Sequence, residues 1–242
     1  SHVSLPGRTI TLDLNGKTNQ GNGMINVGSS NNNSFNTGEY ELATLKLVGE
    51  GSLLQSYPRY ASISVYPGST LDLSGWEGGE ITYVTVGGNS NSTKGDGAIT
   101  GSISEKVKIG TLSLNNLWNT LKVTLNGGSY GVIQISNSQD IYAKSILPKD
   151  YVFRNADGTF VPYEQKINDS NISNVTVVKC SAHQDTDGDK SCDYCNTDIS
   201  SAAAKVTTAQ GETYYFMAEQ DASGVTIDEA VTYANEHNDT IT

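Results

Sequence analysis

Apolar and polar residues alternate in short runs along the first 150 residues of the chain. Four of these runs contain the same five-residue pattern: an apolar residue, any residue, a second apolar residue, any residue, and then glycine. They occupy residues 9–16, 44–49, 70–75 and 122–127. Between them lie shorter triplets: Ile25-Asn26-Val27, Ile63-Ser64-Val65, Val84-Thr85-Val86, Val107-Lys108-Ile109 and Ile133-Gln134-Ile135. A period of two residues predicts β-strands with one buried face.

Strands this short and this frequent favour a solenoid, because each rung buries its inward residues against the neighbouring rungs. We therefore expect residues 1–150 to form a right-handed parallel β-helix in a mainly β chain. Its inward positions are expected to be Leu12, Leu14, Leu45, Leu47, Leu71 and Leu73. An antiparallel β-sandwich also has short alternating strands and is the alternative.

The pattern changes after residue 150. Residues 151–200 are expected to hold a hairpin over 151–161, with Asp157-Gly158 as its turn, a strand over 174–179 and a metal loop that resembles a zinc knuckle. Residues 201–242 predict a strand–helix–strand segment. Thr226 is a suitable N-cap for the helix, whose apolar face is expected to contain Ile227, Ala230, Val231 and Ala234.

The final residues resemble the start of the first run. Asp239-Thr240-Ile241-Thr242 matches Arg8-Thr9-Ile10-Thr11 in three of its four residues. This match predicts that the segment 201–242 leads into a further repeat. One repeat would then span about 230 residues of a tandem array.

Composition narrows the possible partners. Hydrophobic residues make up 36% of the chain, charged residues make up 17%, and the formal net charge is −11. A nucleic-acid-binding surface is usually basic, and an anionic membrane surface repels a negative chain. No run reaches the roughly 18 apolar residues of a transmembrane helix. We therefore expect neither nucleic-acid binding nor membrane insertion by this segment.

The strongest local signal is a Cys/His cluster. Cys180, His183, Cys192 and Cys195 form two close pairs across a loop, and they include all three cysteines of the chain. Zinc favours four sulfur and nitrogen ligands in a tetrahedron, and four protein ligands leave no position open for water. The spacing therefore predicts a structural zinc site. The alternative is a disulfide, Cys192–Cys195 or Cys180–Cys192, which an oxidising extracellular environment would favour.

The same loop carries alternating acidic residues. Asp185, Asp187 and Asp189 place oxygen ligands at positions one, three and five of a calcium-type loop, and Asp193 follows. The bidentate glutamate of such a loop is missing, because Asn196 occupies position twelve. The sequence is compatible with calcium binding and also with an acidic loop that is only solvated.

Binding is the first class of function that the residues favour. Tyr57, Arg59, Tyr60, Tyr66 and Trp76 are of the types that dominate interface hot spots. They are expected near loops between rungs, where solenoids present ligands. The alternative for Tyr66 and Trp76 is that they only cover the corners of the coil.

An enzyme is the second class, because parallel β-helices often belong to polysaccharide lyases and hydrolases. Hydrolases of sugars need paired carboxylates at a defined separation. The acidic residues of the predicted β-helix are mostly single: Asp13, Asp72 and Asp96. We therefore expect no catalytic activity, and a carbohydrate-binding or polysaccharide-degrading domain is the alternative.

Several stretches resemble large repetitive surface proteins of Gram-positive gut bacteria of the Clostridia type. They are residues 10–18, 151–161 and 180–195. The resemblance implies an extracellular position on the bacterial cell surface. It also implies an adhesin-like role, or the role of an immunoglobulin-binding superantigen. On this basis the expected partner is a host protein or glycoprotein, with immunoglobulin as a candidate.

Overall fold

A computed structural model of the protein describes residues 2–5, 7–30, 40–56, 61–87, 97–115, 121–135, 140–167, 172–218, 225–237 and 240–241. The strands of the first half are β1 (His2–Leu5), β2 (Thr9–Asp13), β3 (Thr18–Gly21), β4 (Met24–Val27), β5 (Ser29–Ser30), β6 (Tyr40–Glu41), β7 (Thr44–Glu50), β8 (Ser52–Gln55), β9 (Ile63–Val65), β10 (Thr70–Gly87) and β11 (Ala98–Thr100). The remaining elements are β12 (Val107–Asn115), β13 (Lys122–Val123), β14 (Ser129–Ile135), α1 (Ala143–Ile146), β15 (Tyr151–Asn155), β16 (Ile172–Lys179), β17 (His183–Gln184), β18 (Ala204–Thr207), β19 (Thr213–Phe216), α2 (Val225–His237) and β20 (Thr240–Ile241).

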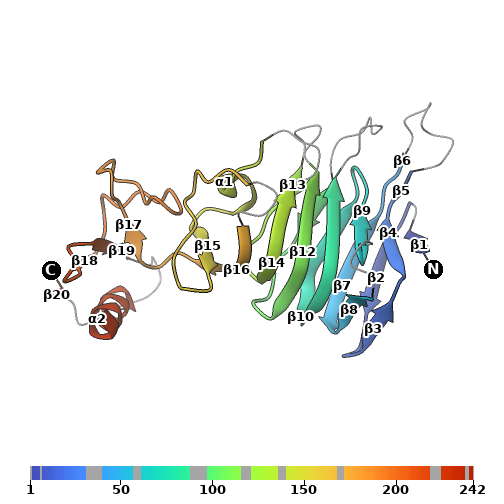
Figure 1. Ribbon diagram of the computed structural model, residues 1–242, viewed down its shortest axis with the longest axis horizontal. Coiled ribbons are helices and arrows are strands. Elements are labelled where there is room, and N and C mark those ends of the chain that lie inside the picture. The colour runs from blue at the N-terminus through green and yellow to red at the C-terminus, as the bar shows by residue number, and fades with distance from the viewer. Residues whose placement is uncertain are drawn as a thin grey trace.

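The chain is mainly β, and its largest sheet is a mixed sheet of 14 strands. The parallel strands stack along the long axis of the molecule, with the N-terminus at one end and a smaller module at the other (Figure 1). Among the described residues, no helix is long and apolar enough to cross a membrane. The prediction of a mainly β fold is confirmed, and the closed coil of a β-helix stays a prediction.

The four predicted runs lie in one parallel ladder, but the first is shifted by two residues from the predicted alignment, because Ile10-Thr11-Leu12 pairs with Leu45-Lys46-Leu47. The strands β2, β7, β10, β11 and β13 pair side by side in that order. Their first apolar residues therefore form one row: Ile10, Leu45, Leu71, Ile99 and Val123. Ile99 belongs to a fifth rung that the sequence pattern does not reveal, because Gly101 occupies the place of its second apolar residue.

The predicted triplets form a second parallel ladder, with one correction. The strands β4, β9, β10, β12 and β14 align the residues Ile25, Ile63, Val84, Leu112 and Ile133. The member of this row in β12 is Leu112-Ser113-Leu114, not the predicted triplet Val107-Lys108-Ile109. Ile109 instead pairs with Ile81 nearer the start of the long strands, because β12 is long enough to carry both patterns.

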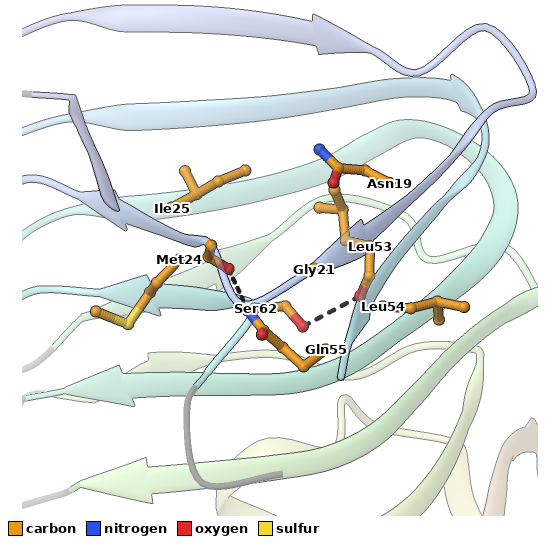
Figure 2. A pocket seen from close by; sticks show the side chains of 9 residues that line it. Asn19, Gly21, Met24, Ile25, Leu53, Leu54, Gln55 and Ser62 are labelled. Carbon is orange, nitrogen blue, oxygen red and sulfur yellow. Dashed lines mark hydrogen bonds between the residues drawn. The ribbon is translucent and has the colours of Figure 1, made fainter. Parts of the chain in front are cut away.

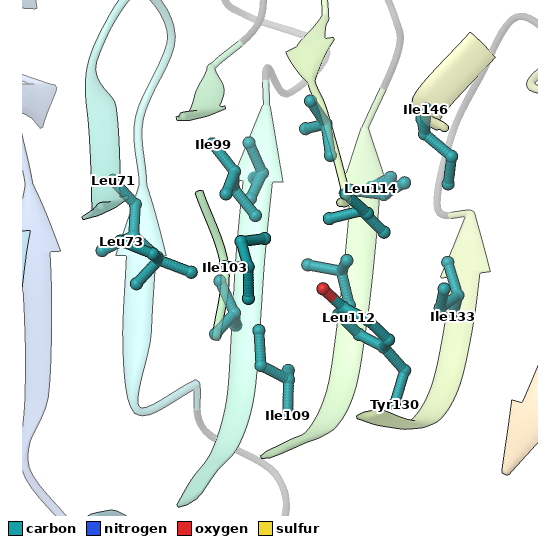
Figure 3. Packing of buried hydrophobic residues seen from close by; sticks show 14 of the residues in the cluster. Leu71, Leu73, Ile99, Ile103, Ile109, Leu112, Leu114, Tyr130, Ile133 and Ile146 are labelled. Atoms are coloured by element: carbon teal, nitrogen blue, oxygen red, sulfur yellow. The ribbon is translucent and has the colours of Figure 1, made fainter. Parts of the chain in front are cut away.

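Both ladders turn their apolar residues into one core (Figure 3). Leu45, Leu47, Leu71 and Leu73 are each no more than 2% exposed, as predicted for inward positions. The other two predicted inward residues, Leu12 and Leu14, are partly buried against the same core, in the N-terminal rung. The core consists almost entirely of aliphatic side chains, and burial of each contributes about 1.5–3 kcal/mol.

The rungs approach each other closely where β10 bends. The backbone N–H of Gly51 donates to the carbonyl oxygen of Gly78 over 3.1 Å. A Cβ atom at Gly79 would lie 1.6 Å from the carbonyl oxygen of Gly51, and the φ angle of Gly79 is 133°. Only glycine fits this corner, because it needs both the space and the unusual backbone angle.

An antiparallel pair closes the C-terminal edge of the parallel stack. Strand β16 pairs with β14 on one side and with β15 on the other, antiparallel in both cases. The predicted hairpin over 151–161 is confirmed, since Asn155 N–H donates to the carbonyl oxygen of Thr159 and Phe153 accepts from Val161. Gly158 adopts a φ of 90° in the turn.

The smaller module contains the sheet β17-β19-β18-β20 and helix α2. Two strands, β18 and β19, precede the helix and β20 follows it, so the segment holds one strand more than predicted. The predicted apolar face of the helix is buried only in part. Ala230 and Ala234 are buried, whereas Ile227 is 60% exposed and Val231 is 37% exposed. The helix packs through its small residues, and the aromatic ring of Tyr233 lies beside them.

The core makes a direct stability prediction. The substitution Leu73→Ala should lower the free energy of unfolding by about 2–5 kcal/mol, because it leaves a cavity among fully buried neighbours. The matched control is Leu42→Ala, since Leu42 is 51% exposed, and its effect should stay within about 1 kcal/mol. Denaturant unfolding measures both, and equal losses would contradict the packing described here.

Candidate metal centre

The four predicted metal ligands lie together at the junction between the parallel stack and the smaller module. Cys180 directly follows β16, His183 begins β17, and Cys192 and Cys195 flank a tight turn. All four side chains are buried, with exposed fractions between 1% and 4%. Buried thiols and a buried imidazole that converge in this way form a group that could hold a metal ion.

The ligand atoms surround a small central space. All four lie within 4.8 Å of one another. The Sγ of Cys180 lies 3.5 Å from Nδ1 of His183 and 3.9 Å from Sγ of Cys192. The Sγ of Cys195 lies 3.3 Å from the same Nδ1 atom. Sequence spacing predicted this convergence correctly.

The turn between Cys192 and Cys195 is fixed by its own backbone. The N–H of Asn196 donates to the carbonyl oxygen of Cys192 over 2.8 Å, and the N–H of Cys192 donates to Thr197. Asn196 has a φ of 57°, a left-handed angle that asparagine tolerates. The N–H of Tyr194 donates to the Cys192 sulfur. Such a donor stabilises the thiolate form, which is the form that binds metals.

A hydrogen-bonded chain ties the group to the start of β15. The carbonyl oxygen of Asp150 accepts from the N–H of Cys180 over 2.7 Å. The carboxylate of Asp150 accepts from the Thr197 hydroxyl, which lies 3.1 Å from the Cys195 sulfur. Outer contacts of this kind orient metal ligands. No sequence motif indicates this role of Asp150 and Thr197.

The crowded thiols shift one another's titration. Hydrogen bonds with Cys192 and Cys195 raise the pKa of Cys180, and the hydrogen bond with Cys180 lowers the pKa of Cys192. Burial alone would lower the pKa of His183, but its hydrogen bonds with Cys192 and Cys195 outweigh burial and raise it to about 9. These shifts favour a thiolate at Cys192 beside a protonated imidazole at His183, so a metal ion would have to displace the imidazole proton when it binds.

The structure does not contain the alternative disulfides. All three cysteines are free thiols, and the Cys180 and Cys192 sulfurs lie 3.9 Å apart. A disulfide needs about 2.05 Å between the sulfur atoms. The observed spacing suits ligands around a shared centre.

The acidic loop beside the group has a different geometry from the one predicted. Carboxylate oxygens of Asp185, Asp187 and Asp193 lie within 4.8 Å of one another. Asp189 is not part of that group, and its carboxylate accepts from the N–H of Ser191 over 2.7 Å. The predicted set at positions one, three and five is therefore wrong. The converging set is positions one, three and nine.

The predicted aromatic binding cluster is not brought together by the described residues. Tyr57, Arg59 and Tyr60 lie outside them. Tyr66 is half-buried directly after β9. Trp76 is only 2% exposed, and its indole N–H donates to the carbonyl oxygen of Gly78, so its predicted role as a ligand anchor is wrong. It packs in the core, as large apolar rings usually do.

A small cavity lies where β3 continues into β4 and β8 is followed by β9 (Figure 2). Its volume is about 320 Å³. The Nε2 atom of Gln55 donates to the carbonyl oxygens of Gly23 and Ala61. Its Oε1 atom is buried and has no partner among the described residues. One amide cannot recognise a particular ligand by itself, so the cavity stays a minor feature.

A wider cleft of about 850 Å³ lies beside the metal group. Four half-buried aromatic residues line it: Phe160, Tyr194, Tyr214 and Tyr233. Their rings form two pairs, with centroids 5.5 Å apart for Phe160–Tyr194 and 4.9 Å apart for Tyr214–Tyr233. The hydroxyl of Tyr194 donates to Oε1 of Gln184, also in the lining, over 3.0 Å.

The metal group and this cleft are physically connected. Gln184 follows the ligand His183, and Tyr194 stands between the ligands Cys192 and Cys195. An ion bound by this group would therefore restrain the backbone beside two lining residues. Sequence reasoning missed the cleft because its residues come from distant segments, and the only local signal was a tyrosine inside the Cys192–Cys195 turn.

Comparison of the chain with protein-family models, with curated proteins and with solved structures finds no match. The inference of function therefore rests on the residues and their geometry.

The link through Thr197 predicts a measurable loss of stability. Thr197→Val removes the hydroxyl that donates to Asp150 and should lower the free energy of unfolding by about 1–2 kcal/mol. The control Thr11→Val changes an exposed position in β2 and should be almost neutral. Thermal unfolding compares the two variants. If Thr197→Val is as neutral as the control, the hydrogen-bonded chain does not support the junction.

Proposed function

We propose that the chain is a non-catalytic binding module on the surface of a bacterial tandem-repeat protein. It binds a host glycoprotein, with immunoglobulin as the foremost candidate. The observation that carries this proposal is the wide aromatic cleft beside the metal group. Half-buried aromatic rings next to polar side chains are the usual make-up of a binding site.

The scaffold of this module is a right-handed parallel β-helix. Two parallel ladders support this reading, because strand after strand returns to the same two rows of apolar residues. Strand β10 carries Leu71 of the first row and Val84 of the second, so the chain passes from one ladder to the other within a single rung. Successive coils of a solenoid behave in this way.

A structural zinc ion completes the junction, held by Cys180, His183, Cys192 and Cys195. A tetrahedral zinc ion has bonds of about 2.3 Å to sulfur and about 2.0 Å to nitrogen, which place two sulfurs about 3.8 Å apart and sulfur and nitrogen about 3.5 Å apart. The measured separations are 3.9 Å between sulfurs and 3.3 and 3.5 Å between sulfur and nitrogen. Four protein ligands make the ion a structural clamp. Calcium in the neighbouring acidic loop has weaker support, because only three carboxylates converge there.

A carbohydrate-binding or polysaccharide-degrading domain is the second candidate. The same cleft favours it, because aromatic rings and amide groups also suit sugars. The two candidates differ in whether a host glycoprotein is captured, and in whether a polysaccharide is cleaved.

The zinc site predicts the metal content of the purified chain. Elemental analysis should find about one zinc ion per chain, because four protein ligands complete one tetrahedron. Cys192→Ser should lose the ion, whereas Asp187→Asn in the neighbouring acidic loop should keep it. Acid should release zinc, because protons compete for the thiolates. A chain prepared without chelator that contains a disulfide and no zinc would contradict this assignment.

The binding role predicts capture without turnover. Immobilised chain should retain immunoglobulin or mucin from intestinal secretions and leave both intact. A chain heated beyond its unfolding transition is the control for nonspecific adsorption. Retained species are identified by mass spectrometry, and the release of unsaturated sugars from polysaccharides is followed by ultraviolet absorbance. Polysaccharide cleavage without capture of any host glycoprotein would overturn the proposal in favour of an enzyme.

A further inference from the structure

The lining of the wide cleft comes from three parts of the fold. The β15 hairpin contributes Arg154, Asp157 and Phe160, and the metal loop contributes Gln184 and Tyr194. The C-terminal sheet and α2 contribute Glu212, Tyr214 and Tyr233. The cleft thus exists only when the hairpin, the metal loop and the C-terminal module are all in place.

The aromatic rings of the cleft suit the flat faces of sugars. Tyr194 and Tyr214 are half-buried, so each ring is held in place while part of it stays accessible. An aromatic face carries negative charge density, which attracts the weakly positive C–H groups of a pyranose face. Tyrosine also loses little conformational entropy on binding, because it has few rotatable bonds.

The polar residues of the cleft suit hydroxyl groups. Gln184 and Gln210 bear amides that both donate and accept, and Arg154 presents a fork of donors. The Asp157 carboxylate accepts from the hydroxyl and the N–H of Thr159, and these bonds lower its pKa, so it is an ionised acceptor near neutral pH. Each hydroxyl of a sugar ring both donates and accepts hydrogen bonds. Neighbouring hydroxyls can therefore pair with these donors and acceptors.

The charge of the lining points to an uncharged ligand. Two cationic side chains, Arg154 and Lys179, face three anionic ones, Asp157, Glu212 and Glu236. This near balance favours neither a polyanion nor a polycation. A volume of about 850 Å³ lies within the range of sites for small organic ligands. We infer that the cleft beside the metal group binds a neutral oligosaccharide of the host glycoprotein.

This inference rests on the proposed function, since it assigns the glycan as the part of the partner that is recognised. The experiment uses the full chain and two forms of the glycoprotein that it captures, intact and enzymatically deglycosylated. Neutral oligosaccharides released from that glycoprotein are titrated separately, by calorimetry or by the change in tyrosine fluorescence. We expect the released glycans to bind and the deglycosylated glycoprotein to lose binding.

Two variants locate the binding in the cleft. Arg154→Ala and Glu212→Ala remove exposed lining side chains and should leave the fold intact. Each should weaken glycan binding, the stronger of the two by at least about tenfold. The matched controls Lys122→Ala and Glu105→Ala change exposed side chains of the parallel stack and should bind as the unaltered chain does.

The outcomes separate this inference from the proposed function. If the deglycosylated glycoprotein binds as tightly as the intact one, the cleft inference fails and the binding role stands. If acidic glycans alone bind, or if the cleft variants bind as the controls do, the inference is likewise overturned. If neither glycoprotein nor glycan binds, both proposals fail. Glycan binding that only the cleft variants lose supports the inference.

Discussion

The register between parallel strands is the constraint on which the rest of the structure depends. Each rung hydrogen-bonds to the next, so the row from Ile10 through Leu71 to Val123 stays buried only while every rung keeps its alignment. A slip of one residue would turn Leu71 outward and Asp72 inward, because successive side chains point to opposite faces of a strand. The corner at Gly79 and Gly51 adds a second constraint, since nothing larger than glycine fits between those rungs.

A stack of parallel strands has two edges, and exposed edges attract further strands. Strands β16 and β15 cover the C-terminal edge by antiparallel pairing, and β16 then leads directly to Cys180. The module beyond has a small core of Val206, Phe216 and three alanines. Such a core offers little stabilisation by itself. A metal clamp at the junction, which we propose as zinc, is therefore suited to hold that module against the stack.

The sequence predicted what depends on local order. The alternating runs led to the parallel strands, Asp157-Gly158 to the hairpin, and the Cys/His spacing to the convergent group. The errors arise where long-range packing decides. Val107-Lys108-Ile109 and Leu112-Ser113-Leu114 have the same pattern, and only the pairing of β12 with β10 distinguishes them. Trp76 has the composition of an exposed anchor, but the bend of β10 places it in the core. Of the predicted face of α2, only Ala230 and Ala234 pack against the C-terminal sheet, and Ile227 and Val231 stay exposed.

The packing of the core also explains why the cleft lies at the junction. The side chains inside the parallel stack maintain its core, so the interior has little room for recognition. The junction is different, because three segments meet there and leave a cleft of about 850 Å³ between them. The Tyr194 hydroxyl donates a hydrogen bond to Gln184 on one of these segments, and the Thr159 N–H donates one to Asp157 on another. Side chains held before a ligand arrives lose less freedom when it binds. The metal clamp that we propose at the junction would thereby also prepare the cleft for the proposed ligand.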